Sequence, residues 1–180
     1  MINDYLETYL MSLGKQVMNR AKAGLQKAGK QGDLENSIQW TLKRTADGYE
    51  VFWSMNYYGA FIDKGVSGNE IKRSFTNYQG LTLASPGTGY TTKQPPPEPL
   101  EKWIKMKGLK GRDKKSGRYI SHRSLAFLIG RKIKRDGIPS IMFFQKPLGL
   151  AMKGFESQVK VAMSKDLEAT IRNKNINFNK

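Results

Sequence analysis

The sequence has no cysteine and a single histidine, His122. Without thiols there is no disulfide, no thiol nucleophile and no thiolate zinc site, and one histidine cannot build a multi-histidine metal site. No uninterrupted apolar run approaches the roughly twenty residues that a membrane span needs. The first ten residues carry acids where a secretory signal would be basic. We therefore expect a soluble, intracellular protein with no membrane association and no cofactor.

Acidic and apolar residues are also scarce. Fifteen Asp and Glu stand against 31 Lys and Arg, a net charge of +16, and hydrophobic residues make up 38% of the chain. A surface this positive attracts polyanions unless acidic chains neutralise it. The length of 180 residues suffices for one domain with a modest core. We expect a single domain over residues 1–180.

The first sixty residues show clear periodicities. Apolar residues recur at three- and four-residue steps over residues 3–29, which predicts an amphipathic helix. Apolar and polar residues then alternate over 38–43 and 49–53 around an Asp-Gly turn, which predicts a β-hairpin. Residues 57–64 predict a short helix that Gly65 ends.

The rest of the chain mixes loops and helices. Residues 65–97 are rich in glycine and end in Gln94-Pro95-Pro96-Pro97, so we expect an extended loop or arm insertion, with one irregular hairpin inside it. We expect helices over 98–107 and 121–136, a strand over 141–144, a final helix from 148, and a polar tail over 173–180. The fold class is α+β: a small antiparallel sheet packed against long N- and C-terminal helices, with a loop and helix insertion.

Positive charge is concentrated in one region. Residues 101–135 hold 13 Lys and Arg against Glu101 and Asp113. Such clustering attracts phosphates without reading base sequence, although a solvated face is an equally good explanation. If DNA lies nearby, the residues that face it are Lys110, Arg112, Lys114, Lys115, Arg118, Arg131, Lys132, Lys134 and Arg135.

We find no convincing catalytic motif. His122 lies beside Ser121 and Ser124, but side chains this close at one helix start point in different directions, and no acid adjoins them. Glu98 and Glu101 are explained as acids in the first turn of a helix. The glycines of 85–90 lack the Lys-Ser or Lys-Thr of a phosphate-binding loop. We expect no catalytic residue and no metal ligand.

Three segments resemble one protein family. Leu34, Ser37 and Ile38 open the hairpin; Tyr58-Gly59-Ala60-Phe61-Ile62 with Gly65 follows it; Phe144 and Pro147 precede the last helix. Their order and composition are similar to the tail-completion or neck proteins of tailed bacteriophages, which join head to tail. Asp63 stands where that family usually has Glu, Val66 where Thr is common, and Gly59 is an insertion.

The resemblance implies a structural virion protein made in the host cytoplasm and located in the neck or tail region. It implies an oligomeric head-tail connector ring around the DNA channel, with portal or adaptor and tail proteins as partners and packaged DNA contacted without sequence preference. The insertion at 65–97 and the polar tail at 173–180 would act as arms that contact adjacent rings. The residues that it makes candidates for the subunit interface are Tyr57, Tyr58, Phe61, Asp63, Lys64 and Phe144.

Two other readings of the sequence remain open. The first is a free-standing basic protein that binds nucleic acid without sequence preference, with the helix at 121–136 against the phosphate backbone. The second is an enzyme such as a nuclease, which would need a cluster of metal-binding carboxylates. Asp63 and Glu98 are its only candidates. The aromatic residues at 57–61 can also be explained as ordinary core.

Overall fold

The computed structural model describes residues 4–90 and 92–178, with side chains through Asn173. Its contacts group the chain into two compact units. Of the described residues, unit 1 contains those up to Gly59, Thr76–Leu81, and those from Met142 onward, whereas unit 2 contains Ala60–Phe75 and Thr82–Ile141. We expected one domain with an insertion at 65–97. Most of that insertion instead belongs to unit 2.

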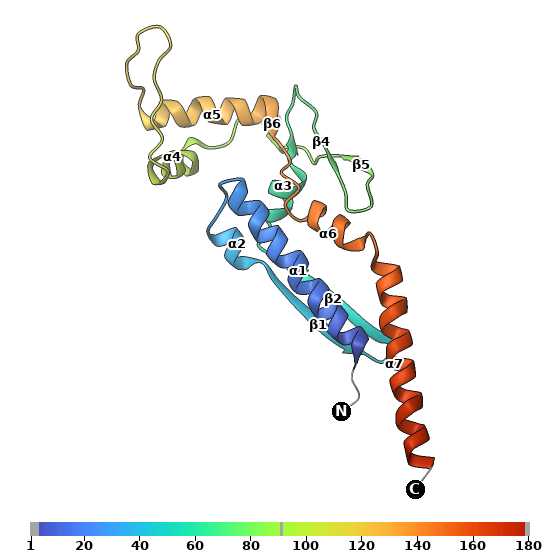
Figure 1. Ribbon diagram of the computed structural model, residues 1–180. Helices are drawn as coiled ribbons and strands as arrows, with labels where there is room; N and C mark the ends of the chain where they lie inside the picture. Colours follow the sequence, from blue (N-terminus) through green and yellow to red (C-terminus); the bar gives the residue numbers. More distant parts are fainter. Residues whose placement is uncertain (1–3, 91, 179–180) are drawn as a thin grey trace. The chain divides into compact units, whose positions relative to one another are not determined.

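Unit 1 contains the long helices and the largest hairpin (Figure 1). Helix α1 (Tyr5–Lys27) packs on strands β1 (Gln39–Thr45) and β2 (Gly48–Ser54) and on helix α7 (Phe155–Phe178). The α+β class predicted from the sequence, a small antiparallel sheet packed on long terminal helices, is confirmed. The side chains that α1 buries are Leu10, Leu13, Val17, Ala21 and Leu25.

The β1–β2 hairpin contacts α1 through two tryptophans. Trp40 and Trp53 are paired across the antiparallel strands. A Cβ added to Gly14 of α1 would lie 2.3 Å from the Trp40 ring, and the Trp53 indole N–H donates to the Gly14 carbonyl oxygen at 3.2 Å. Helix and hairpin therefore approach so closely at Gly14 that no larger side chain fits there. Just before β1, the short helix α2 (Asp33–Ser37) buries Leu34.

Carboxylates hold the first turn of α1. The Asp4 side chain caps the helix by accepting from the Glu7 backbone N–H at 2.9 Å. Asp166 of α7 accepts from the backbone N–H groups of Tyr5 and Leu6 at 2.6 and 3.0 Å. The Tyr49 hydroxyl of β2 donates to Asp4. The free N–H groups of a helix start thus tie α1, β2 and α7 together.

The C-terminal part of the chain differs from the sequence prediction. Residues 141–144 form no strand. Helix α6 (Gln145–Met152) follows them directly. Pro147 lies in its first turn, where a missing backbone N–H breaks no helical hydrogen bond. The helical conformation is interrupted at Lys153 and Gly154, so two helices, α6 and α7, stand where we expected one. The chain then stays helical through Phe178, where we expected a tail.

Unit 2 is built from short elements. Strands β3 (Val66–Ser67) and β6 (Gly137–Ile138) pair antiparallel. A two-stranded sheet of β4 (Ser74–Thr76) and β5 (Thr82–Ala84), whose residues 76–81 are grouped with unit 1, confirms the expected irregular hairpin. The helices of unit 2 are α3 (Gly59–Lys64), which begins at the unit boundary, α4 (Pro97–Met106) and α5 (His122–Asp136).

The contact at Gly14 makes a prediction about stability. Gly14→Ala should lower the free energy of unfolding by about 1–3 kcal/mol, because overpacking against Trp40 outweighs the better helix propensity of alanine. Gly24→Ala on the same helix is the matched control. Its new Cβ would lie 3.4 Å from Phe143, an ordinary contact. Urea denaturation should show the control at or above the wild-type stability; equal effects of the two changes would contradict the prediction.

The Tyr49–Asp4 hydrogen bond makes stability depend on pH. It lowers the pKa of Asp4 and raises the pKa of Tyr49 to about 12. The Asp4 contribution is therefore present above the ordinary carboxyl pKa and lost as the pH falls through the lowered one. The Tyr49 contribution is present below pH 10 and lost as the pH rises through about 12.

Tyr49→Phe should therefore cost about 1 kcal/mol at neutral pH, with both groups partly exposed. Thermal denaturation of wild type and variant across the pH range should show this difference constant near neutrality and shrinking at both extremes. A difference that does not vary with pH would contradict the proposed role of the hydrogen bond.

Candidate nucleic-acid interface

Helices α4 and α5 pack against each other and carry the basic region of the sequence. Ile104 of α4 and Ala126 of α5 are fully buried. Ser121 caps α5 by accepting from the Ser124 backbone N–H at 3.1 Å. At the other end Gly137 has φ 70°, and a Cβ there would lie 2.0 Å from the Val66 carbonyl oxygen, so only glycine fits. Both helix ends lie where the sequence predicted them.

The loop between α4 and α5 is held by its own side chains. The Arg112 guanidinium donates to the Tyr119 hydroxyl at 2.7 Å and lies 4.5 Å from the centre of that ring. The Asp113 carboxylate accepts from the backbone N–H groups of Lys115 and Ser116 at 3.0 and 2.8 Å. The hydrogen bonds from Ser116 are the main cause that lowers the pKa of Asp113. The loop therefore presents its lysines on an ordered turn.

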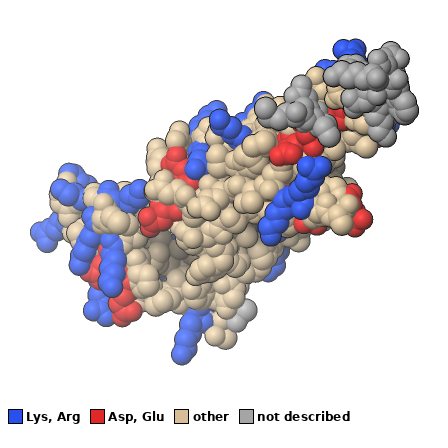
Figure 2. Space-filling model, turned by 90° about the horizontal axis from the view of Figure 1, so that it is seen from below, with Lys and Arg blue, Asp and Glu red and all other residues tan. Residues whose placement is uncertain are grey.

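The cations of this loop are exposed. Lys110, Lys114, Lys115 and Arg118 all face solvent. Within the described part of the chain no carboxylate lies within ion-pairing distance of them. Figure 2 shows Lys and Arg side chains projecting at the left of the view, with some acidic side chains among them. Five of the nine cations that we predicted to face DNA lie on this loop.

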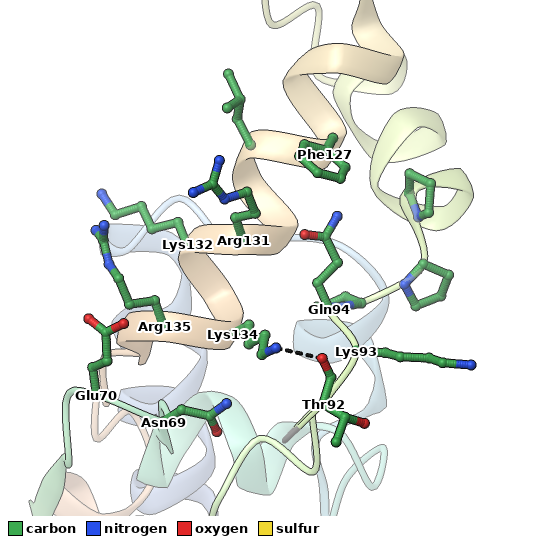
Figure 3. Close-up of a pocket in the computed structure, with 14 residues that line it drawn as sticks. Asn69, Glu70, Thr92, Lys93, Gln94, Phe127, Arg131, Lys132, Lys134 and Arg135 are labelled. Carbon is green, nitrogen blue, oxygen red and sulfur yellow. Dashed lines mark hydrogen bonds between the residues drawn. The ribbon is translucent and has the colours of Figure 1, made fainter.

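The four cations near the end of α5 differ in what they contact. Arg131 and Lys132 are exposed. Lys134 donates to the Thr92 carbonyl oxygen at 2.6 Å, as Figure 3 shows. Arg135 forms two hydrogen bonds, at 2.6 and 3.0 Å, to the carboxylate of buried Asp136, and these are the main cause that lowers the pKa of Asp136. Arg131 and Lys132 are thus better placed for an external anion than Lys134 and Arg135.

A groove of about 790 Å³ lies beside these cations (Figure 3). Helix α5 forms one wall, and the segment Thr92–Pro97 and residues Asn69 and Glu70 form the others. Pro95 is buried, and its carbonyl oxygen would lie 3.3 Å from a Cβ on Gly130. The glycine lets the proline segment approach α5 closely.

Sequence reasoning missed this groove. Leu128 and its neighbour Phe127, which line the groove, are each 50% exposed. The helix instead buries Ala126 and Gly130. Residue 128 lies about 200° round the helix from residue 126, so both cannot face the same neighbour. The small residues Ala126 and Gly130, four apart, were the available signal for the contact face.

The six candidate interface residues are divided between the units. In unit 1, Tyr57 is 84% exposed with its ring edge-on to Tyr58, and Phe144 packs edge-on against Trp53. In unit 2, Phe61 is 44% exposed and Lys64 lies over the Phe75 ring. Asp63, also a candidate for the subunit interface, is buried and only 3% exposed.

Three of the groups weighed as catalytic, Ser121, Ser124 and Glu101, have structural partners. Ser121 and Ser124 form the α5 cap, with their hydroxyl oxygens 2.9 Å apart. Glu101 pairs with Lys105 at 2.8 Å. No group of three His, Cys, Asp or Glu within residues 4–90 and 92–178 could hold a metal ion. None of the helices described there is long and apolar enough to cross a membrane.

Comparison with known proteins gives no relative. No protein-family model matches the chain, and no curated protein or solved structure matches it. Any functional assignment therefore rests on the residues themselves.

The loop makes a prediction about DNA binding. If Lys114 and Lys115 each contact a phosphate, reversing both (K114E/K115E) should weaken binding to duplex DNA about tenfold and reduce the slope of log K against log salt by about 2. The matched control reverses Lys15 and Lys43, two exposed lysines of unit 1. Fluorescence anisotropy over a salt series measures both. Equal losses in the two variants would show general attraction to net charge rather than a surface on the loop.

Proposed function

We propose that this chain is a structural virion protein, a subunit of an oligomeric head-tail connector ring of the neck or tail-completion type, located around the DNA channel. The proposal starts from the resemblance carried by Leu34, Ser37 and Ile38, by Tyr58–Gly65, and by Phe144 and Pro147. A protein in this position needs surfaces for neighbouring subunits and a cationic surface that tolerates DNA.

One observation carries the proposal: among its described residues the chain exposes 23 large apolar side chains, against 13 buried hydrophobic residues. Its accessible surface is 12940 Å². Two separate compact units of these sizes would together expose roughly 10,600 Å² by the usual scaling of surface with mass. Large exposed apolar patches mark interaction sites in native proteins.

An exposed apolar stripe on helix α7 is our candidate surface for a neighbouring subunit. Met163, Leu167 and Ile171 recur at four-residue steps along it, so they lie on one side, and each is more than half exposed. Another side of α7 is already used within the chain, because Ala162 is buried and Asp166 caps α1. The exposed stripe therefore remains for another subunit, as does the exposed Tyr57.

The basic loop and α5 fit the same assembly. A ring around DNA requires cations that contact the phosphate backbone without reading sequence. Lys114, Lys115 and Arg118 have no carboxylate partner within the described part of the chain. The same observation favours the second candidate function, a free-standing nucleic-acid-binding protein. The two differ in whether the protein assembles.

Assembly is tested with the α7 stripe. Leu167→Glu with Ile171→Glu should abolish ring formation or addition to particles that lack this protein, because it places charges in the proposed subunit interface. The matched control places glutamates at Ser157 and Ser164, exposed polar positions of the same helix. Sedimentation velocity gives the mass, and electron microscopy shows symmetric addition at the portal vertex.

Two results would contradict the connector. One is a wild-type protein that stays monomeric and does not add to particles. If that monomer binds duplex DNA tightly with a steep salt dependence, the nucleic-acid-binding function takes its place. The other is a glutamate variant that assembles as well as its control.

A further inference from the structure

The groove beside α5 contains cations and apolar side chains together, which phosphate binding alone does not explain. Five cations line it, Lys93, Arg131, Lys132, Lys134 and Arg135, against one acid, Glu70. Phe127 and Leu128, half exposed, line the same groove with three prolines. We propose that this groove binds an acidic, extended peptide segment of a different protein, with an aromatic or aliphatic side chain seated on Phe127 and Leu128.

Charge complementarity makes the occupant anionic. Lys134 and Arg135 already bind Thr92 and Asp136. Lys93 and Arg131 have no hydrogen-bond or ion-pair partner in the described part of the chain. Figure 3 shows Arg131 and Lys132 projecting from one side of α5, with Phe127 nearer to Gln94. Arginine and aromatic residues are both enriched in protein interfaces.

A second copy of this chain does not fit this groove. The groove is lined by five cations and one acid, so it calls for an acidic segment, and this chain has no two adjacent acidic residues. Several of its acidic side chains are also used internally. Asp4 and Asp166 cap α1, Asp113 holds the basic loop, Asp136 binds Arg135, and Glu101 binds Lys105. The anionic segment must come from another protein.

Nucleic acid explains the apolar side less well. Single-strand binding sites stack successive bases on several aromatic rings. Phe127 is the one aromatic side chain among the residues that line the groove. The groove's volume of about 790 Å³ lies within the range of pockets that bind compact ligands. A volume of this size suits a few side chains of an extended peptide. The rigid proline segment provides a wall that costs little entropy to order.

Peptide binding can be tested with the whole protein and a defined probe. The probe is a fluorescein-labelled hexapeptide, Asp-Glu-Phe-Asp-Leu-Glu, and the comparison peptide has lysine in place of each acid. Fluorescence anisotropy should show binding of the acidic peptide at micromolar to sub-millimolar concentration and none of the basic one.

Two variants separate the groove from general charge attraction. Arg131→Glu and Phe127→Ser should each weaken peptide binding about tenfold. Lys114→Glu carries the same charge change as Arg131→Glu on the loop outside the groove, and it should change binding less than about twofold. Circular dichroism melting checks each fold, and Leu128→Ser replaces Phe127→Ser if the latter does not fold.

Three results would overturn the proposal. They are no binding of the acidic peptide up to about 1 mM, equal weakening by Lys114→Glu and Arg131→Glu with no effect of Phe127→Ser, and competition by an oligothymidylate whose affinity depends on Phe127. The last would make the groove a single-strand site. The peptide assay needs no assembled ring, so its outcome is independent of whether the connector function holds.

Discussion

The close approach of α1 to the β1–β2 hairpin at Gly14 is the constraint on which unit 1 depends. It places the Trp53 indole against the Gly14 carbonyl oxygen. From Gly14 back to Asp4 the helix advances about 15 Å, and from Trp53 back to Tyr49 the strand covers about 13 Å. The two elements therefore meet again at the start of α1, where Tyr49 donates to Asp4. Asp166 adds α7 to the same point. One missing side chain thus fixes the register of three elements.

Close backbone packing at glycines also shapes unit 2. Gly130 lets the Pro95 backbone approach α5, and Gly137 lets the helix end turn directly into β6 beside Val66. Both glycines are needed for packing rather than for flexibility. Because α5 uses its small residues for these contacts, Phe127, Leu128 and Arg131 are left outside the contact. The groove is therefore a consequence of how the helix packs.

Much of this fold follows from local sequence. The helix starts and ends at α4 and α5, the Asp-Gly hairpin and the glycine that ends α3 are local signals, and they were predicted correctly. The errors occurred where long-range contacts decide. The apolar run 141–144 is as compatible with a buried turn as with a strand, and its packing against α1 near Gly24 could not be deduced. The cations of the site were visible in the composition, but the burial of Asp63 and the exposure of Phe127 depend on neighbours distant in sequence.

The cations of the basic region form two different surfaces, one on the loop between α4 and α5 and one on α5. They differ in which side chains the cations contact, which composition alone does not reveal. On the loop, Lys114, Lys115 and Arg118 extend from a turn that Asp113 holds, with no apolar side chain required for their contacts. Such an arrangement suits a phosphate backbone, which offers charge at many positions and no pocket. On α5, Lys134 and Arg135 are satisfied internally, and Arg131 adjoins exposed apolar residues. A protein partner with complementary apolar side chains can cover that apolar surface and exclude water from it. A phosphate backbone offers only charge there. We therefore propose separate roles for the two parts of the basic region, DNA contact for the loop and peptide binding for the groove beside α5.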